Sequence, residues 1–144
     1  MSPVLKATIG LLLALAAAWV WHWPLGNGAR LIDRLEAEAR REVANAELPG
    51  IGVSLSRDPL ARVATLSGTA NGLQREGLGS QKGVSDHARD VEGISEVRWT
   101  DEPDSGRRVI PLLAETSSLA ALAYLIGLGL GWLVWGRRRR EGFA

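Results

Sequence analysis

The chain has 144 residues, with 17 Lys and Arg, 16 Asp and Glu, and no Cys. The absence of Cys excludes disulfides, thiol catalysis and thiolate metal sites, and the near-neutral charge leaves no basic face for nucleic acid. The length allows one small domain besides membrane segments. Residues 24–111 contain 12 Lys and Arg against 14 Asp and Glu, so the positive excess comes from the C-terminal end.

Residues 1–24 are predicted to form a membrane-spanning helix. The apolar run from Ala7 to Trp23 is interrupted only by Thr8 and His22. A secretory signal peptide, the alternative, would have a shorter apolar region that ends in a small-x-small cleavage site, whereas this run ends in tryptophans and the later Asn27-Gly28-Ala29 is a poor match. We therefore favour a retained helix. Its tryptophans are expected to mark a membrane interface: they are Trp19, Trp21 and Trp23.

Residues 25–100 are predicted to form a small domain that begins with an amphipathic helix. From Arg30 onward, apolar residues recur at steps of four and charged residues cover the other faces. Glu36 and Arg40 form a favourably oriented i, i+4 pair. The apolar stripe consists of Leu31, Leu35, Ala39 and Val43, and the charged faces of Arg34, Glu36, Glu38, Arg40, Arg41 and Glu42.

Three strands and a second helix are predicted in the rest of this domain. Residues 51–55 and 62–67 alternate in hydrophobicity on either side of an Asp58-Pro59 turn, which indicates an antiparallel hairpin. A second helix is expected over about residues 73–90, and a third strand over residues 94–100. The order helix, strand, strand, helix, strand predicts an α+β fold, with a three-stranded sheet and two helices on one of its faces.

Two motifs and one arginine in this domain match a known family. They are Thr65-Leu66-Ser67-Gly68-Thr69, Arg75, and Val91-Glu92-Gly93-Ile94-Ser95-Glu96-Val97. On these residues, the stretch from about Arg30 to Thr100 resembles the BON domain, a module named for bacterial osmotic-shock and nodulation proteins. The resemblance implies an αββαβ fold and a location in the cell envelope. It also implies a role in membrane or phospholipid attachment, or as a structural module of larger envelope proteins, without catalysis.

Three glycines in the second predicted helix depart from the family pattern, which usually has alanine or larger residues there. They are Gly77, Gly79 and Gly83. Each glycine costs about 1 kcal/mol relative to alanine in a helix interior. The second helix is therefore expected to be short, kinked or stabilised by a neighbour.

Residues 101–111 are predicted to be a linker, and residues 112–136 a second membrane helix. From Leu119 to Trp135 the chain has 17 residues without a charge, which is at the lower end for crossing a hydrocarbon core of about 30 Å. Aromatic residues followed by cations are the order expected at a membrane interface. These residues are Trp132, Trp135, Arg137, Arg138, Arg139 and Arg140. The tail, residues 137–144, is expected in the cytoplasm.

Two spans would place both termini on the same side of a membrane. The arginine tail assigns that side to the cytoplasm of a bacterial inner membrane, and so places the central domain in the periplasm. Arg30 and Arg34 outweigh Lys6 around the first helix and favour the opposite orientation. Because the loop between the spans is longer than the range of the positive-inside rule, we give the tail more weight.

Small residues recur at steps of four in both predicted spans. Such faces allow helix backbones to approach closely in lipid, where hydrophobicity does not drive helix association. The alternative is that Gly and Ala are simply frequent in membrane helices. We favour a packing face most strongly for Gly127 and Gly131. The two candidate faces consist of Ala123, Gly127 and Gly131, and of Gly10, Ala14 and Ala18.

Residues that could carry chemistry are few. His22 and His87 are the only histidines and belong to different predicted compartments, so no paired imidazole site is expected. His22, between Trp21 and Trp23, could ligate a pigment or haem, although an interfacial polar residue is the ordinary interpretation. We predict no catalytic residue, no metal and no cofactor.

These features leave three functional hypotheses. The favoured one is a non-enzymatic accessory or scaffold subunit of a larger bacterial membrane complex, for example a photosynthetic or respiratory assembly, with the BON-like domain bracing its periplasmic face. The second is an envelope-maintenance protein whose BON-like domain binds phospholipid, although the acidic balance does not attract anionic lipid. An enzyme is least favoured, because no nucleophile, base and stabiliser can be assembled. The expected partners are membrane lipids and other integral membrane subunits, with no nucleic acid.

Overall fold

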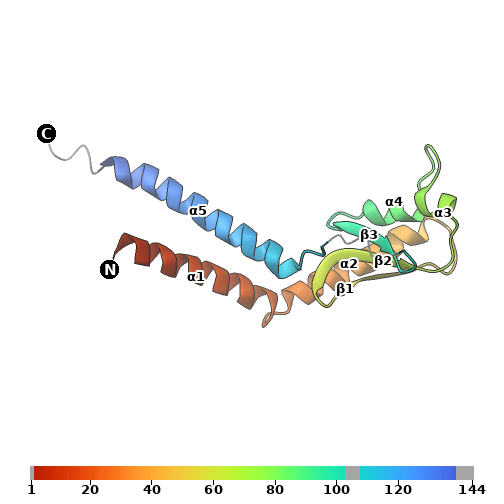
Figure 1. The fold of residues 1–144 in the computed structure, drawn as a ribbon, viewed down its shortest axis with the longest axis horizontal. Helices are drawn as coiled ribbons and strands as arrows, with labels where there is room; N and C mark the ends of the chain where they lie inside the picture. The colour runs from red at the N-terminus through yellow and green to blue at the C-terminus, as the bar shows by residue number, and fades with distance from the viewer. Residues whose placement is uncertain (1, 103–107, 139–144) are drawn as a thin grey trace. The chain divides into compact units, whose positions relative to one another are not determined.

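The computed structural model describes residues 2–102 and 108–138, and their side chains as far as Val134. α1 and α5 belong to one compact unit, and residues 26–112 form a second, which we call the α+β domain. Figure 1 shows the elements along the chain. They are α1 (Pro3–His22), α2 (Asn27–Ala44), β1 (Gly52–Arg57), β2 (Leu60–Ser67), α3 (Gly72–Glu76), α4 (Val84–Arg89), β3 (Glu96–Trp99) and α5 (Leu112–Arg138).

The three strands form one mixed sheet in the order β1-β2-β3. β1 and β2 are antiparallel, with Val53 opposite Leu66 and Leu55 opposite Ala64, so the predicted hairpin is confirmed. β3 is parallel to β2, and the connection between them runs through α3 and α4. The predicted α+β class with a three-stranded sheet is therefore confirmed.

Helices α2 and α4 pack on the sheet and supply its hydrophobic core. α2 contacts β1 and β2, and α4 contacts β3. The predicted stripe of α2 is largely buried, because Leu35, Ala39 and Val43 all lie in the core, and Ile32 lies beside them. Their partners are the inward side chains of the strands and of α4: Val53, Leu55, Ala64, Leu66, Val84, Ala88 and Trp99.

The second helix is not continuous, so the prediction of one helix over about residues 73–90 was wrong in its middle. α3 ends at Glu76, and α4 begins at Val84. Gly77 and Gly79 have positive φ angles of 76° and 62°, which side chains other than glycine rarely adopt. A Cβ atom added to Gly83 would lie 2.3 Å from the backbone nitrogen of Gly77. The glycines therefore form a tight turn between two short helices.

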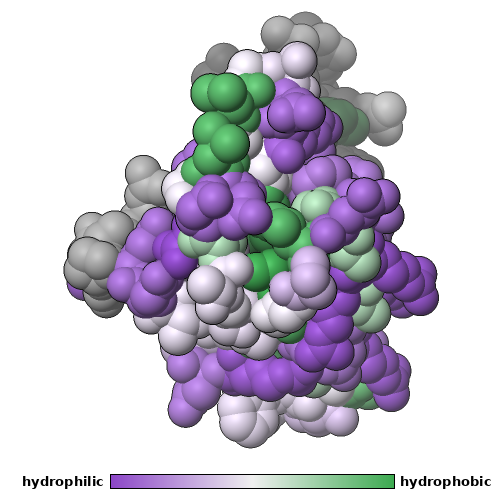
Figure 2. All heavy atoms as spheres, turned by 90° about the vertical axis from the view of Figure 1, so that its right-hand side faces the viewer, coloured by the Kyte–Doolittle hydropathy of each residue, from purple (hydrophilic) through white to green (hydrophobic). Residues whose placement is uncertain are grey.

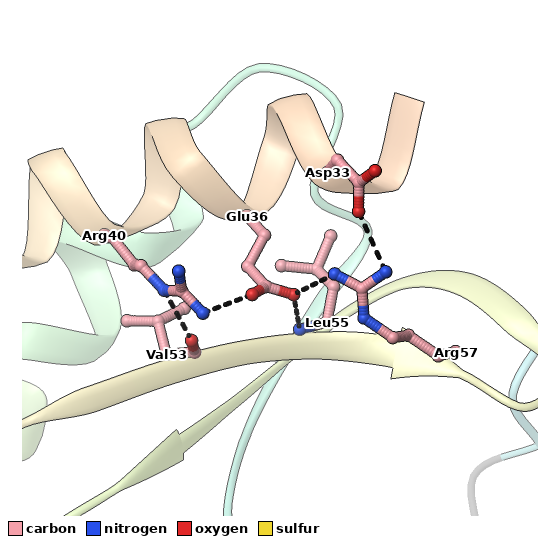
Figure 3. Close-up of polar contacts among 6 residues, drawn as sticks. All are labelled: Asp33, Glu36, Arg40, Val53, Leu55 and Arg57. Atoms are coloured by element: carbon pink, nitrogen blue, oxygen red, sulfur yellow. Dashed lines mark hydrogen bonds and ion pairs between the residues drawn. The ribbon is translucent and has the colours of Figure 1, made fainter. Parts of the chain in front are cut away.

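Glu36 corrects a second prediction, because it is buried and does not lie on a solvated charged face. One carboxylate oxygen is bound by the guanidinium of Arg40, as expected for the i, i+4 pair. The other accepts hydrogen bonds from the backbone N–H of Leu55 at 3.2 Å and from Nη2 of Arg57 at 3.1 Å. Figure 3 shows this cluster between α2 and β1.

The Glu36 cluster closes the outer edge of β1. β1 is at the edge of the sheet, so one row of its backbone groups has no strand partner. The N–H of Leu55 is bound by Glu36, and the carbonyl of Val53 accepts a hydrogen bond from Nε of Arg40 at 3.2 Å (Figure 3). Side chains of α2 therefore satisfy backbone groups that another strand would otherwise bind.

Two helices are long and apolar enough to cross a membrane. They are Pro3–His22 and, within α5, Leu112–Val134. No residue in the most apolar stretch of either helix is fully buried. Ser2 caps the N-terminus of α1, because its hydroxyl accepts a hydrogen bond from the N–H of Leu5 at 3.2 Å. These helices are compatible with a membrane protein.

Candidate packing surface of the apolar helices

One face of α1 is partly covered in the structure, while the other described residues of the helix are exposed except His22 at its end. Its members are spaced by three and four residues, as expected for one side of a helix. The small residues singled out by sequence, Gly10, Ala14 and Ala18, all lie on this face. The complete face consists of Ala7, Gly10, Leu11, Ala14, Leu15 and Ala18.

Tyr124 of α5 contacts this face directly. Its hydroxyl donates a hydrogen bond to the backbone carbonyl of Ala7 at 2.7 Å. A Cβ atom added to Gly10 would lie only 2.3 Å from the Tyr124 oxygen. The absence of a side chain at Gly10 thus leaves room for the phenol ring, and the hydroxyl gains a partner that apolar surroundings would not supply.

Sequence reasoning did not identify Tyr124 as a packing residue. The available signal was that it is the single tyrosine of the chain and lies in the middle of an apolar helix. A hydroxyl in such a segment requires a hydrogen-bond partner, because hydrocarbon supplies none. Its acceptor, the carbonyl of Ala7, could not be read from residue spacing.

A second surface, on α5, is open. Five residues of α5 line an apolar hollow of about 480 Å³, which we call the α5 groove. Cβ atoms added to Gly127 or Gly131 would meet nothing within 4 Å, so no described part of the chain fills it. Ala123, the third member of the predicted set, is exposed and does not line the hollow. The lining residues are Tyr124, Gly127, Leu128, Gly131 and Trp132.

The predicted interface anchors are exposed wherever the structure describes them. Each of the four indole side chains given below is exposed, as an aromatic group beside lipid headgroups would be. The helix continues through Trp135, Arg137 and Arg138, whose side chains lie outside the described part, as do Arg139 and Arg140 entirely. The exposed anchors are Trp19, Trp21, Trp23 and Trp132.

His22, the possible pigment ligand, is buried at the end of α1. Its Nδ1 atom is buried and has no hydrogen-bond partner among the described residues. Within the same part of the chain, no three His, Cys, Asp or Glu side chains are grouped to hold a metal ion. A pigment-binding role for His22 remains a prediction.

Arg75, one of the residues that carry the family resemblance, joins α3 to the end of β3. Its guanidinium lies 4.2 Å from the ring centroid of Trp99 and forms two hydrogen bonds with the carboxylate of Asp101, at 2.9 and 2.6 Å. The indole of Trp99 donates to the hydroxyl of Ser85 at 3.0 Å. This cluster fixes α3 and α4 to the sheet, a structural role that sequence reasoning missed.

The Arg75 pair makes a prediction about pH. The hydrogen bond from Arg75 lowers the pKa of Asp101 below its usual value of 3.8. A depressed folded-state pKa contributes stability that is present above the unfolded pKa and is lost as the pH falls through the folded one. We expect Asp101→Asn to be less stable than the parent at pH 6, with the difference shrinking below about pH 4. Urea unfolding of both chains at pH 6 and pH 3 measures this, and a constant difference would contradict it.

The described residues thus contain a contact between the apolar helices and an open groove on α5. The contact is formed by Tyr124 with Ala7 and Gly10, and the groove by residues around Gly127 and Gly131. These surfaces can bind apolar helices or lipid chains. Comparison of the chain with protein-family models, curated proteins and solved structures gives no match.

Proposed function

We propose that the chain is a non-enzymatic membrane subunit that packs against helices of a larger bacterial membrane complex, such as a photosynthetic or respiratory assembly. The observation that carries the proposal is the open α5 groove. Gly127 and Gly131 leave its floor without side chains, so a partner helix can approach the backbone closely. In lipid, such close packing is a main source of helix association.

The α+β domain would brace the complex on the periplasmic side. Support for a BON-like domain comes from the order helix, strand, strand, helix, strand, with the second helix split into α3 and α4. The four arginines at residues 137–140 favour cytoplasmic termini in the inner membrane. A scaffold role also agrees with Glu36 and Ser85, buried polar groups whose hydrogen bonds join elements of the fold.

The groove provides the test. We expect the double variant Gly127→Leu/Gly131→Leu to fill it and to reduce co-purifying subunits at least tenfold, about 1.4 kcal/mol of association free energy. The matched control is Gly129→Leu, because Gly129 is exposed, has open space around it and does not line the groove. The readout is purification from the native membrane in a gentle detergent, followed by native gel and mass spectrometry.

Two results would count against the subunit proposal. If the double variant retains all partners of the parent, the groove is not the packing surface. If the parent itself runs alone and carries phospholipid, the envelope-maintenance function becomes the better account. In that case the double variant and the Gly129→Leu control should bind phospholipid equally, because neither changes the α+β domain.

A further inference from the structure

A hollow lies at the end of the α+β domain where α2 finishes and α4 begins. It has a volume of about 360 Å³, and we call it the end pocket. Figure 2 shows this end of the domain, with hydrophobic surface near its centre and hydrophilic residues around it. The side chains that matter for the argument are Leu48, Leu73, Leu78, Val84, Glu47 and Lys82.

The glycine turn between α3 and α4 forms one wall of the end pocket. Leu78 and Gln81 pair across the turn through two backbone hydrogen bonds, of 3.0 and 3.1 Å. A Cβ atom on Gly77 would lie 2.2 Å from the carbonyl oxygen of Gln81, so the chain can fold back this tightly only with glycine there. The turn holds Leu78 outward, 67% exposed, and Leu73 on α3 is 56% exposed. Two leucines therefore border the hollow without being covered.

Acidic groups outnumber basic ones around the end pocket, although one of them, Asp86, is bound by Arg89 at 3.3 Å. Lys82 is the single Lys or Arg among the described lining residues, and it is already paired with Asp90 at 2.6 Å. Asp86 and Glu42 are also close enough to raise the pKa of Lys82, after the larger effect of Asp90. Glu47 lines the hollow and forms no ion pair among the described residues. A ligand group that complements the acidic residues around the end pocket carries positive charge.

We propose that the end pocket binds a segment of a partner polypeptide, which inserts an apolar side chain flanked by Lys or Arg. The apolar side chain contacts Leu73 and Leu78, and the cation faces Glu47. Anchors of this kind, seated in a pocket and surrounded by a polar rim, supply most of the energy of protein interfaces.

A polypeptide fits the end pocket better than a small molecule does. Pockets for small ligands bury most of the ligand surface, whereas this hollow leaves Leu73 and Leu78 open to solvent at its border. A partner protein covers those leucines with the surface around its anchor. The proposal does not depend on the α5 groove, since it concerns residues of the α+β domain alone.

The probe is a fluorescein-labelled peptide, Gly-Ser-Lys-Trp-Lys-Ser-Gly, titrated against the full chain in neutral detergent and followed by anisotropy. Two matched peptides replace either both lysines with glutamate or the tryptophan with alanine. We expect the Lys-Trp-Lys peptide to bind at least tenfold more tightly than either. Equal binding of the Glu-Trp-Glu peptide would overturn the proposal. Tryptamine binding as tightly as the peptide would show a small-molecule site and would also overturn it.

Variants of the chain separate the pocket from detergent effects. Leu73→Ser/Leu78→Ser should weaken peptide binding at least tenfold, and Glu47→Lys should weaken it severalfold. Both leucines are exposed, so the fold is expected to survive, which amide exchange in β2 checks. The matched control is Ile110→Ser, because Ile110 is also exposed but lies outside the pocket. Equal peptide binding by the leucine variant and the control would reject the end pocket as the binding site.

Discussion

Replacing Trp99 with alanine is expected to lower the free energy of unfolding of the α+β domain by about 3–5 kcal/mol. Trp99 is 4% exposed and lies in the hydrophobic core, so truncation leaves a large cavity. The change also removes the ring beneath Arg75 and the indole N–H bound to Ser85. Ser85 is itself buried, and its hydroxyl then loses a donor.

The measurement is amide hydrogen exchange on the full chain in detergent, read on peptides that cover β2 and β3, since these report opening of the domain. Trp99→Phe is the matched control. It keeps an aromatic ring for the core and for Arg75 but cannot donate to Ser85, so we expect a loss of about 1–2 kcal/mol. If alanine and phenylalanine gave equal losses, packing of the indole would not be the main contribution of Trp99.

Sequence reasoning predicted the elements of the α+β domain wherever one residue pattern determined the local structure. The i+4 stripe of α2 fixed its buried face, and the alternation on either side of Asp58-Pro59 fixed the hairpin. It failed at Glu36, because a carboxylate spaced for the solvated face can be buried when a neighbouring strand offers a backbone donor such as Leu55. That donor is 19 residues away in sequence, so local periodicity carries no information about it.

The second helix was misjudged for a different reason. Three glycines were expected to weaken it, but the prediction still joined residues 73–90 because Val84, Ala88 and Val91 lie on one helical stripe. The positive φ angle of Gly77, the C-cap of α3, and that of Gly79 allow the chain to turn there. The helix propensity of glycine gives the free-energy cost of placing it in a helix. It does not indicate the residue at which the helix ends.

The candidate packing surfaces show what spacing alone cannot distinguish. Gly10 and Gly127 belong to sets with the same four-residue spacing, yet Gly10 lies against Tyr124 and Gly127 has open space around it. Which side of α5 contacts α1 depends on the rotation of each helix about its axis. That rotation follows from particular contacts, such as the hydrogen bond from Tyr124 to the carbonyl of Ala7.

The Glu36 cluster should be the other sensitive point of the domain, and we expect Glu36→Ala to cost about 2–3 kcal/mol. Removing one partner of a buried ion pair typically costs about 3–5 kcal/mol. The Glu36 side chain is 8% exposed, but those of Arg40 and Arg57 are 60% and 54% exposed. Both arginines can be solvated again when Glu36 is removed, so we expect a cost below that of a fully buried pair. The backbone N–H of Leu55 would be left without its acceptor.

Two further substitutions separate charge from hydrogen bonding at Glu36. Glu36→Gln retains an acceptor for the N–H of Leu55 but removes the ion pairs, so we expect a loss of about 1 kcal/mol. Glu38→Ala is the matched control on the same helix, because Glu38 is exposed, and it should change stability by less than about 0.5 kcal/mol. Exchange rates of β1 amides provide the measurement. If Glu36→Ala matched Glu38→Ala, the edge of β1 would be stable without its cover from α2, and water would satisfy the Leu55 N–H.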